Sequence, residues 1–113
     1  MHDTTPSGTA IVGATMIDSR GVVEHSVVII NGGKIQASGT MAATPIPPGM
    51  EKVEGRGKFV VPLPEKLASL EKDQRASLLL LSADPRSDPA NLRKVERVMV
   101  DGKWQAGTEP YAN

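Results

Sequence analysis

Short runs of hydrophobic residues follow one another along the chain, and each run stops at a cluster of glycine, proline, asparagine or aspartate. The first run is TAIVGATMID, which has small and apolar residues on both alternating faces and ends at the turn cluster of residues 18–21. This pattern predicts one continuous strand from Thr9 to Asp18. Residues 1–8 are polar and rich in turn formers, so we expect a frayed tail there.

A β-hairpin is the strongest local prediction. The β-branched residues 27–30 run into Asn31-Gly32-Gly33, and residues 34–37 (KIQA) follow. Asn-Gly adopts positive φ angles at little cost, and two-residue hairpin turns require such angles. Residues 40–50 contain three prolines and a glycine. We predict a loop there because proline cannot complete a regular strand ladder.

We predict a second hairpin between residues 52 and 61. Residues 52–54 read as a short strand, Gly55-Arg56-Gly57 as the turn, and residues 58–61 as the antiparallel partner strand. Pro62 and Pro64 then end the second strand.

The next segment is ambiguous when taken by itself. The spacing of Leu67 and Leu70 permits an amphipathic helix over residues 65–76. The leucine run 78–81 is short, continuous and bounded by Ala83-Asp84-Pro85, which favours a buried strand.

The last part of the chain predicts a turn and a closing hairpin. Asp88-Pro89-Ala90-Asn91 indicates a turn, followed by one helical turn at most. Strands over residues 95–100 and 103–105 flank Asp101-Gly102 at the spacing of a tight hairpin. Residues 107–113 are a polar tail.

Short strands at regular intervals with little helix predict an all-β fold, a small β-sandwich or open barrel. A chain of 113 residues is long enough to bury such a core in one domain, which we place at residues 9–106. The residues expected in the core are Ile11, Val12, Ile17, Val28, Ile30, Ile35, Val60, Leu79, Leu81, Val98 and Val100.

Composition and charge disfavour several classes of function. Thirteen basic and thirteen acidic residues cancel, so no summed field attracts nucleic acid or an anionic membrane. The chain has no cysteine, which excludes disulfides, thiolate nucleophiles and thiolate metal ligands. It shows neither a signal-peptide pattern nor an apolar run of the roughly 20 residues that span a bilayer, so we expect a cytoplasmic protein.

Three motifs in the N-terminal half resemble the amidohydrolase superfamily of metal-dependent hydrolases. They are Thr15–Asp18 (TMID), Asn31–Ile35 (NGGKI) and Gly55–Pro62 (GRGKFVVP). The family has a Thr-x-Ile-Asp-like turn, an Asn/Asp-Gly-Lys-Ile hairpin and a Gly-Lys-Gly-Lys-x-Val-x-Pro strand in the same order. The resemblance implies that this half corresponds to the segment before the family's catalytic barrel.

The C-terminal half is similar to the segment that follows the barrel in the same family. Ala68–Leu78 (ASLEKDQRASL) resembles the family's Gly-Ser-Leu-Glu-x-Gly-Lys-x-Ala-Asp-Leu, and a leucine-rich strand, Asp84-Pro85 and Val95–Gly102 (VERVMVDG) follow in order. The family's Ser-Leu-Glu part is a short strand or extended link. The resemblance therefore replaces the helix over residues 65–76 by strand and coil.

The main departure from the family lies between the two halves. After the proline the family continues into a Gly-Leu-Ile-Asp and His-x-His strand of a barrel that is typically about 250 residues long. This chain has Leu63-Pro64-Glu65-Lys66 instead. The resemblance implies one composite domain of residues 9–62 and 70–106, with the junction 63–69 in place of the barrel and without the barrel's metal ligands and catalytic aspartate.

The residues left for chemistry form no recognisable site. A hydrolytic zinc centre commonly takes three protein ligands, often histidine, but the chain has only His2, in the predicted tail, and His25. Asp84 and Asp88 each precede proline, and turn formation explains both better than a calcium site does. We therefore predict no catalytic residue, no metal site and no cofactor.

Other motifs have structural explanations. Gly55–Lys58 and Asn31–Lys34 lack the strand, loop and helix context of a phosphate loop, and no serine lies in a Gly-x-Ser-x-Gly elbow. The basic cluster of residues 93–97 is interrupted by Glu96 and lacks neighbouring aromatics, which favours a solvated face over nucleic-acid stacking.

The expected function is that of a stand-alone, non-catalytic structural or interaction module. Loss of the barrel would uncover the apolar surface that faced it, so we expect a homo-oligomer or a protein partner. The candidate interface residues are Leu63, Leu67 and Trp104. Tryptophan is frequent at interface hot spots, although packing over the sandwich edge is the favoured interpretation for Trp104.

Two other interpretations stay open. The chain could be the accessory subunit of a split metal-dependent hydrolase that acts on carbon–nitrogen bonds, or a remnant without a selected role. The sequence identifies no small-molecule ligand.

Overall fold

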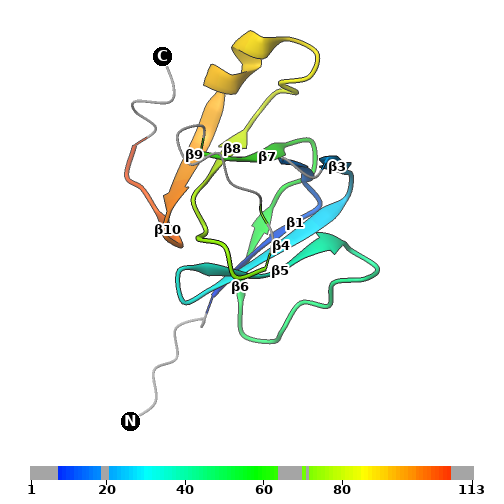
Figure 1. Cartoon of the computed structure of the whole chain (residues 1–113), viewed down its shortest axis with the longest axis vertical. Coiled ribbons are helices and arrows are strands. Elements are labelled where there is room, and N and C mark those ends of the chain that lie inside the picture. Colours follow the sequence, from blue (N-terminus) through cyan, green and yellow to red (C-terminus); the bar gives the residue numbers. More distant parts are fainter. Residues whose placement is uncertain (1–7, 19–20, 64–69, 71, 108–113) are drawn as a thin grey trace.

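Two mixed β-sheets make up the part of the chain that the computed structural model describes, residues 8–18, 21–63, 70 and 72–107. Sheet A has the order β5-β4-β1-β6, and sheet B has the order β10-β9-β8-β7-β2-β3 (Figure 1). The fold is nearly all β and neither sheet closes into a barrel, which confirms the predicted fold class. The strands of sheet A are β1 (Thr9–Val12), β4 (Ser26–Asn31), β5 (Lys34–Thr40) and β6 (Glu51–Glu54). Those of sheet B are β2 (Thr15–Asp18), β3 (Gly21–Val23), β7 (Phe59–Pro62), β8 (Leu78–Leu81), β9 (Val95–Val100) and β10 (Lys103–Trp104).

Two parallel segments of the chain pass from sheet A to sheet B. β1 continues through Gly13 into β2, and β6 continues through Gly55–Lys58 into β7. β1 pairs parallel with β6, and β2 pairs parallel with β7. Gly13 has a φ of 89°, and its N–H donates to the carbonyl of Ser26 at 2.7 Å. A Cβ at Gly55 would lie 2.8 Å from the Cβ of Ala14, so glycine lets the two segments bend in close contact.

This crossing corrects two predictions. The run from Thr9 to Asp18 is two strands in different sheets, because the chain turns at Gly13. The predicted second hairpin is also wrong: β6 lies at the edge of sheet A, whereas β7 lies inside sheet B. The N–H of Thr15 donates to the carbonyl of Lys58 at 3.0 Å, so the turn before β7 is fastened to β2 instead of folding β7 back on β6.

The hairpins predicted at Asn31-Gly32 and Asp101-Gly102 are both confirmed. In the β4–β5 hairpin Asn31 pairs with Lys34, and in the β9–β10 hairpin Val100 pairs with Lys103. Gly102 has a φ of 84°, which tight turns of this kind require. The strand at residues 78–81 is confirmed as β8, and the helical turn is the 3₁₀ helix η2 (Pro89–Arg93).

Most of the ambiguous segment lies outside the described residues. Its described part, residues 70 and 72–76, contains a turn at Lys72-Asp73 and an isolated bridge between Lys34 and Arg75. That part has no helix, in agreement with the strand and coil that the family resemblance implied. No helix within the described ranges is long and apolar enough to cross a membrane.

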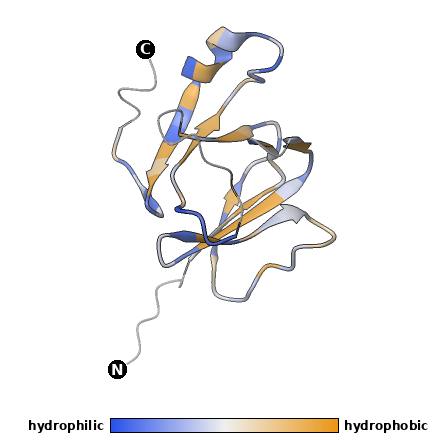
Figure 2. Cartoon of the chain, in the orientation of Figure 1, coloured by the Kyte–Doolittle hydropathy of each residue, from blue (hydrophilic) through white to orange (hydrophobic). Residues whose placement is uncertain are grey.

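The main core lies between the two sheets, and hydrophobic residues follow β4 and β8 in Figure 2. It takes Ile11, Val28 and Ile30 from sheet A, and Leu78 and Leu80 from sheet B. Strand residues alternate between faces, so Leu78 and Leu80 point to sheet A while their neighbours point away. The other fully enclosed members of this cluster are Ala14, Met16, Ile35, Val60, Leu70, Ala76 and Met99.

The predicted core residues therefore divide between clusters. Leu79, Leu81 and Val98 are buried as predicted, but they lie in a second cluster with Val61 and Leu63 on the other face of sheet B. Leu78 and Leu80, which were not among the predicted core residues, are buried as well, since four consecutive leucines show no alternation that would separate the two faces. Three predicted core residues are only half-buried, namely Val12, Ile17 and Val100.

A third cluster lies on the outer face of sheet A. It contains Ala10, Val27 and Ile29, and Ile46 and Met50 from the proline-rich segment pack against it. The loop predicted over residues 40–50 is confirmed except at Thr40, the last residue of β5, and residues of this loop cover an apolar sheet face.

Candidate functional site

The two halves of the chain meet in sheet B. β7, the last strand of the N-terminal half, pairs antiparallel with β8 from Phe59 opposite Leu81 to Pro62 opposite Leu78. The N–H of Leu63 donates to the carbonyl of Ser77 at 3.2 Å, directly beyond this ladder. The chain therefore leaves the N-terminal half beside the point where the first strand of the C-terminal half begins.

Leu70 is held by one side chain from each sheet. Its N–H donates to Asp18 Oδ2 at 2.7 Å, and its carbonyl accepts a hydrogen bond from Ser38 Oγ at 2.6 Å. Asp18 ends β2 in sheet B, and Ser38 lies in β5 of sheet A. The Leu70 side chain is fully buried in the main core, which contributes about 1.5–3 kcal/mol. The two polar side chains thus fix the place where the C-terminal half enters the core.

The turns of the two confirmed hairpins lie against each other. Ala76 connects them, because its N–H donates to the carbonyl of Gly33 at 3.0 Å and its carbonyl accepts from the N–H of Gly102 at 2.9 Å. A Cβ at Gly102 would lie 2.6 Å from the Cα of Gly33, closer than real side chains approach. We call these three residues the glycine joint. It brings the two backbones together in a space that no side chain can share.

Further hydrogen bonds extend the glycine joint in both directions. The N–H of Ile35 donates to the carbonyl of Gln74, and the N–H of Asp73 donates to the carbonyl of Ile35, both at 2.8 Å. The N–H of Asp101 donates to Ser77 Oγ at 3.1 Å. Residues 73–77 are therefore clamped between the N-terminal hairpin and the C-terminal hairpin.

Trp104 lies on β10, the edge strand of sheet B. Its ring is half-buried against the main core, and the guanidinium carbon of Arg97 lies 3.9 Å from the ring centroid, within cation–π range. Trp104 Nε1 is buried, and no hydrogen-bond partner for it exists within the described part of the chain. The ring thus packs at the sandwich edge, in agreement with the favoured interpretation of this residue.

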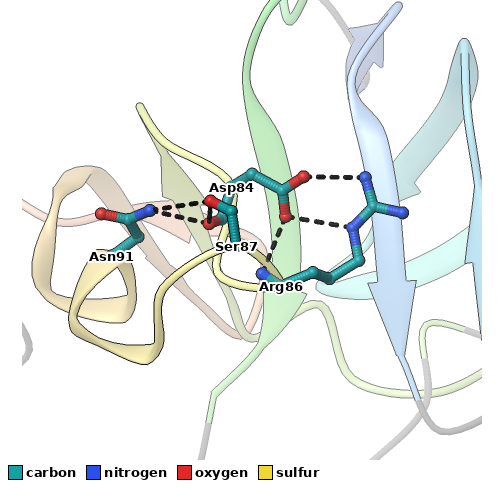
Figure 3. Close-up of polar contacts among 4 residues, drawn as sticks. All are labelled: Asp84, Arg86, Ser87 and Asn91. Atoms are coloured by element: carbon teal, nitrogen blue, oxygen red, sulfur yellow. Dashed lines mark hydrogen bonds and ion pairs between the residues drawn. The ribbon is translucent and has the colours of Figure 1, made fainter.

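A bidentate surface ion pair lies in the loop between β8 and η2. Asp84 Oδ1 accepts from the backbone N–H of Arg86 at 2.8 Å and from its Nε at 3.0 Å, and Oδ2 lies 2.9 Å from NH2 (Figure 3). Hydrogen bonds from the Arg86 side chain and then from its backbone hold the pKa of the Asp84 carboxyl below its ordinary value. The same carboxylate raises the pKa of Arg86.

The backbone of Asp84 is also engaged. Its carbonyl accepts from Asn91 Nδ2 at 2.7 Å and from Ser87 Oγ at 3.0 Å, on the opposite side from Arg86 in Figure 3. Asp88 caps η2, because its Oδ1 accepts from the N–H of Ala90 at 3.0 Å. The two carboxylates weighed as an ion site therefore have separate partners and shape the loop.

The remaining sequence candidates also take part in turns. His25 has a φ of 50°, and its carbonyl accepts from the N–H of Met41 at 3.1 Å, while His2 lies outside the described residues. The lysine of the GRGK motif, Lys58, forms an ion pair with Glu96 at 2.8 Å that links β7 to β9. Within the described ranges, no group of three or more histidine, cysteine or acidic residues is arranged to hold a metal.

The candidate interface residues differ in accessibility. Leu63 is only 2% exposed in the cluster on the outer side of sheet B. Leu67 lies outside the described residues, and Trp104 is half-buried. The residues that join the two halves were not identified as a site from the sequence. Asp18 and Gly33 were noted only as parts of motifs, and no local signal indicates that Leu70 and Gly102 meet them.

Surface hollows lie at both ends of the β4–β5 hairpin of sheet A, and described residues line them. The larger, about 420 Å³, lies beside the glycine joint, and Glu51 is the one ionisable side chain among its described lining residues. The smaller, about 150 Å³, lies between β3 and β5 and includes Met16 and Val22. Backbone and small residues dominate the larger hollow, so few side chains there can orient a ligand.

Comparison with known proteins gives a partial match. No protein-family model and no curated protein matches the chain. Among solved structures, the chain is similar to molinate hydrolase, an amidohydrolase, with 30% identity and a TM-score of 0.45. The match covers 51% of this chain and 13% of that protein. A superposition of this extent decides neither family nor activity.

Proposed function

We propose that this chain is a non-catalytic β-sandwich module, related to the domain that amidohydrolases build from both chain ends, and that it acts in structure or protein interaction. One observation carries the proposal: the segments that resemble the family join the two halves of the fold. Asp18 of the TMID motif accepts from Leu70, and Gly33 of the NGGKI motif contacts Ala76 and Gly102.

The third motif has the same kind of role. Val61 and Pro62 of GRGKFVVP pair with Leu79 and Leu78, and Lys58 forms its ion pair with Glu96. Each of these contacts spans the junction between the halves. The proposed composite domain therefore consists of residues 9–62 and 70–106, connected where the family inserts its barrel.

The proposed mode of interaction is self-association at the open edge of sheet B. Within the described residues, β9 pairs with β10 only at Met99 and Val100, and the N–H of Gln105 adds one bond to the carbonyl of Val98. The earlier part of β9 thus presents backbone groups at an edge, and such edges pair readily with another strand. Arg97 and Trp104 lie beside this edge and belong to the residue types that dominate interface hot spots.

Solution mass as a function of protein concentration tests the proposal. We expect a dimer that dissociates on dilution, and Arg97→Glu should weaken it because the substitution removes the cation over Trp104. Lys52→Glu makes the same charge change on β6, at the edge of sheet A, and should leave the dimer intact. Both variants must keep the unfolding midpoint of the parent chain at a concentration at which all three are monomeric, because dimerisation itself stabilises the fold.

The other outcomes are informative. A strict monomer that binds no protein would contradict the interaction role and favour the alternative that the chain is a remnant without a selected role. Hydrolysis of carbon–nitrogen bonds that appears only when the chain is mixed with a separate barrel subunit would replace the proposal by a split hydrolase. Equal weakening by both charge substitutions would place the interface elsewhere.

A further inference from the structure

The turn of the β4–β5 hairpin combines an exposed asparagine with a following glycine. Asn31 is exposed, and a Cβ built at Gly32 meets no atom within 4 Å, so the space around that backbone is open. The nitrogen of the next residue can attack an asparagine side chain when no side chain of its own hinders the approach, which is the condition that glycine meets. We propose that Asn31 is a deamidation site and that its conversion loosens the glycine joint.

The reaction needs water and no other reagent. The Gly32 backbone nitrogen loses its proton to solvent and attacks Asn31 Cγ, forming a carbon–nitrogen bond. The bond between Cγ and Nδ2 breaks, and the side-chain nitrogen takes up a proton and leaves as ammonia. Water then opens the five-membered imide at either carbonyl. One product has aspartate at position 31, and the other has isoaspartate, in which the chain runs through the side-chain carbon.

The fold protects the other described asparagine. Asn91 is 8% exposed, is followed by Leu92, and donates from Nδ2 to the carbonyl of Asp84 at 2.7 Å. Among the described residues, Asn31 Nδ2 donates to Gln36 Oε1, at 3.2 Å between exposed side chains. An exposed hydrogen bond of this kind is exchanged easily for water, so brief opening of the turn frees the Asn31 side chain. The reaction should therefore be selective for Asn31.

The consequence follows from where the turn is docked. Isoaspartate adds a carbon to the backbone immediately before Gly32-Gly33. The carbonyl of Gly33 accepts from Ala76, and Gly33 lies so close to Gly102 that a single added carbon at Gly102 would clash. A longer backbone cannot keep both the strand pairing of Asn31 with Lys34 and this contact. The isoaspartyl chain should lose the contact between the hairpin turns, which joins the two halves.

Incubation of the full chain at mildly alkaline pH, followed by peptide mapping with mass spectrometry, tests the site. We expect the amide-to-acid mass change and the isoaspartyl product at Asn31, with Asn91 unchanged over the same period. The isolated isoaspartyl species should unfold at a lower urea concentration than untreated protein. Asn31→Asp, which introduces the charge without lengthening the backbone, should keep the parent midpoint. Asn31→Ser should show neither the mass change nor the drift in stability.

Two results would overturn the proposal. One is an Asn31 that stays intact in the folded chain while the urea-unfolded chain is converted, since the fold would then protect the site. The other is an isoaspartyl species whose urea midpoint equals that of the untreated chain, since the modification would then leave the glycine joint unaffected.

Discussion

The glycine joint and the loop of residues 82–94 are both held by hydrogen bonds, but the bonding groups differ. In the joint, Gly33, Ala76 and Gly102 connect backbone to backbone where a Cβ has no room. In the loop, side chains form the hydrogen bonds that set it apart from the joint, and the ion-paired side chains of Asp84 and Arg86 are 27% and 43% exposed. The first region is confined and the second is solvated.

This difference determines how each region responds to change. Water can replace an exposed ion pair, so its loss costs little. Backbone groups in a confined contact have no such replacement, and an added carbon must push two chain segments apart. The charged side chains of Asp84 and Arg86 therefore stabilise a surface loop, whereas Gly33 and Gly102, which have no side chain, form the contact between the two halves of the chain.

The largest predicted effect comes from filling the glycine joint. Gly102→Ala should destabilise the protein by roughly 2–4 kcal/mol, because it adds a steric clash with Gly33 to the strain of an alanine at φ 84°. Gly57→Ala is the matched control: its φ is 76°, but a Cβ there meets nothing within 4 Å. It should cost about 1 kcal/mol. Urea unfolding of both variants measures the difference, and equal losses would show that the joint is not confined.

Much of the local structure could be predicted from the sequence, but the order of the strands could not. Asn31-Gly32 and Asp101-Gly102 lie between apolar runs and predicted both hairpins correctly, since turn chemistry is local. The crossing at Gly13 was predicted as part of one continuous strand, and the crossing at Gly55–Lys58 as a hairpin turn, because a glycine turn looks the same whether it folds a strand back or leads it to another sheet. The outcome depends on partners elsewhere in the chain, such as the carbonyl of Lys58, which accepts from Thr15.

The residues of the candidate site were harder still to predict. Asp18 and Leu70 are 52 positions apart, and no periodic pattern connects them. The family resemblance implied that the segment around Leu70 corresponds to the one after the family's barrel. It therefore predicted that the two halves of this chain form one domain. It did not say which atoms meet. The three-dimensional structure is needed to identify the contact, because only the pairing of strands in sheet B places Asp18, at the end of β2, beside Leu70.

A second prediction compares a buried carboxylate contact with an exposed one. Asp18 accepts from the N–H of Leu70 at 2.7 Å in a partly buried setting, and Asp88 accepts from the N–H of Ala90 at 3.0 Å at the surface. Asp18→Ala should cost about 2–3 kcal/mol, because it leaves a backbone donor without its acceptor beside the core. Asp88→Ala should cost about 0.5–1 kcal/mol, as for an exposed cap.

Urea unfolding of the two alanine variants, with Asp18→Asn as a third, measures this contrast. Asparagine keeps an acceptor oxygen near Leu70, so Asp18→Asn should lose less stability than Asp18→Ala. If Asp88→Ala were the more damaging of the two alanine substitutions, the loop rather than the junction would limit the stability of the fold.

The smallest predicted effect concerns pH and the surface ion pair. Because Arg86 lowers the pKa of Asp84 in the folded chain, the pair stabilises the fold above the unfolded-state pKa, and this contribution is lost as the pH falls through the folded-state pKa. Arg86→Ala should raise the pKa of Asp84 towards its ordinary value, though the backbone N–H of residue 86 still donates to it. Arg93→Ala, which removes a cation at the end of η2, should leave that pKa unchanged. Carboxyl carbon chemical shifts measured through the acid range report both variants. An Asp84 pKa that is the same with and without the Arg86 side chain would mean that the exposed ion pair is fully solvated. The difference in stabilisation between this loop and the confined glycine joint would then be larger than predicted.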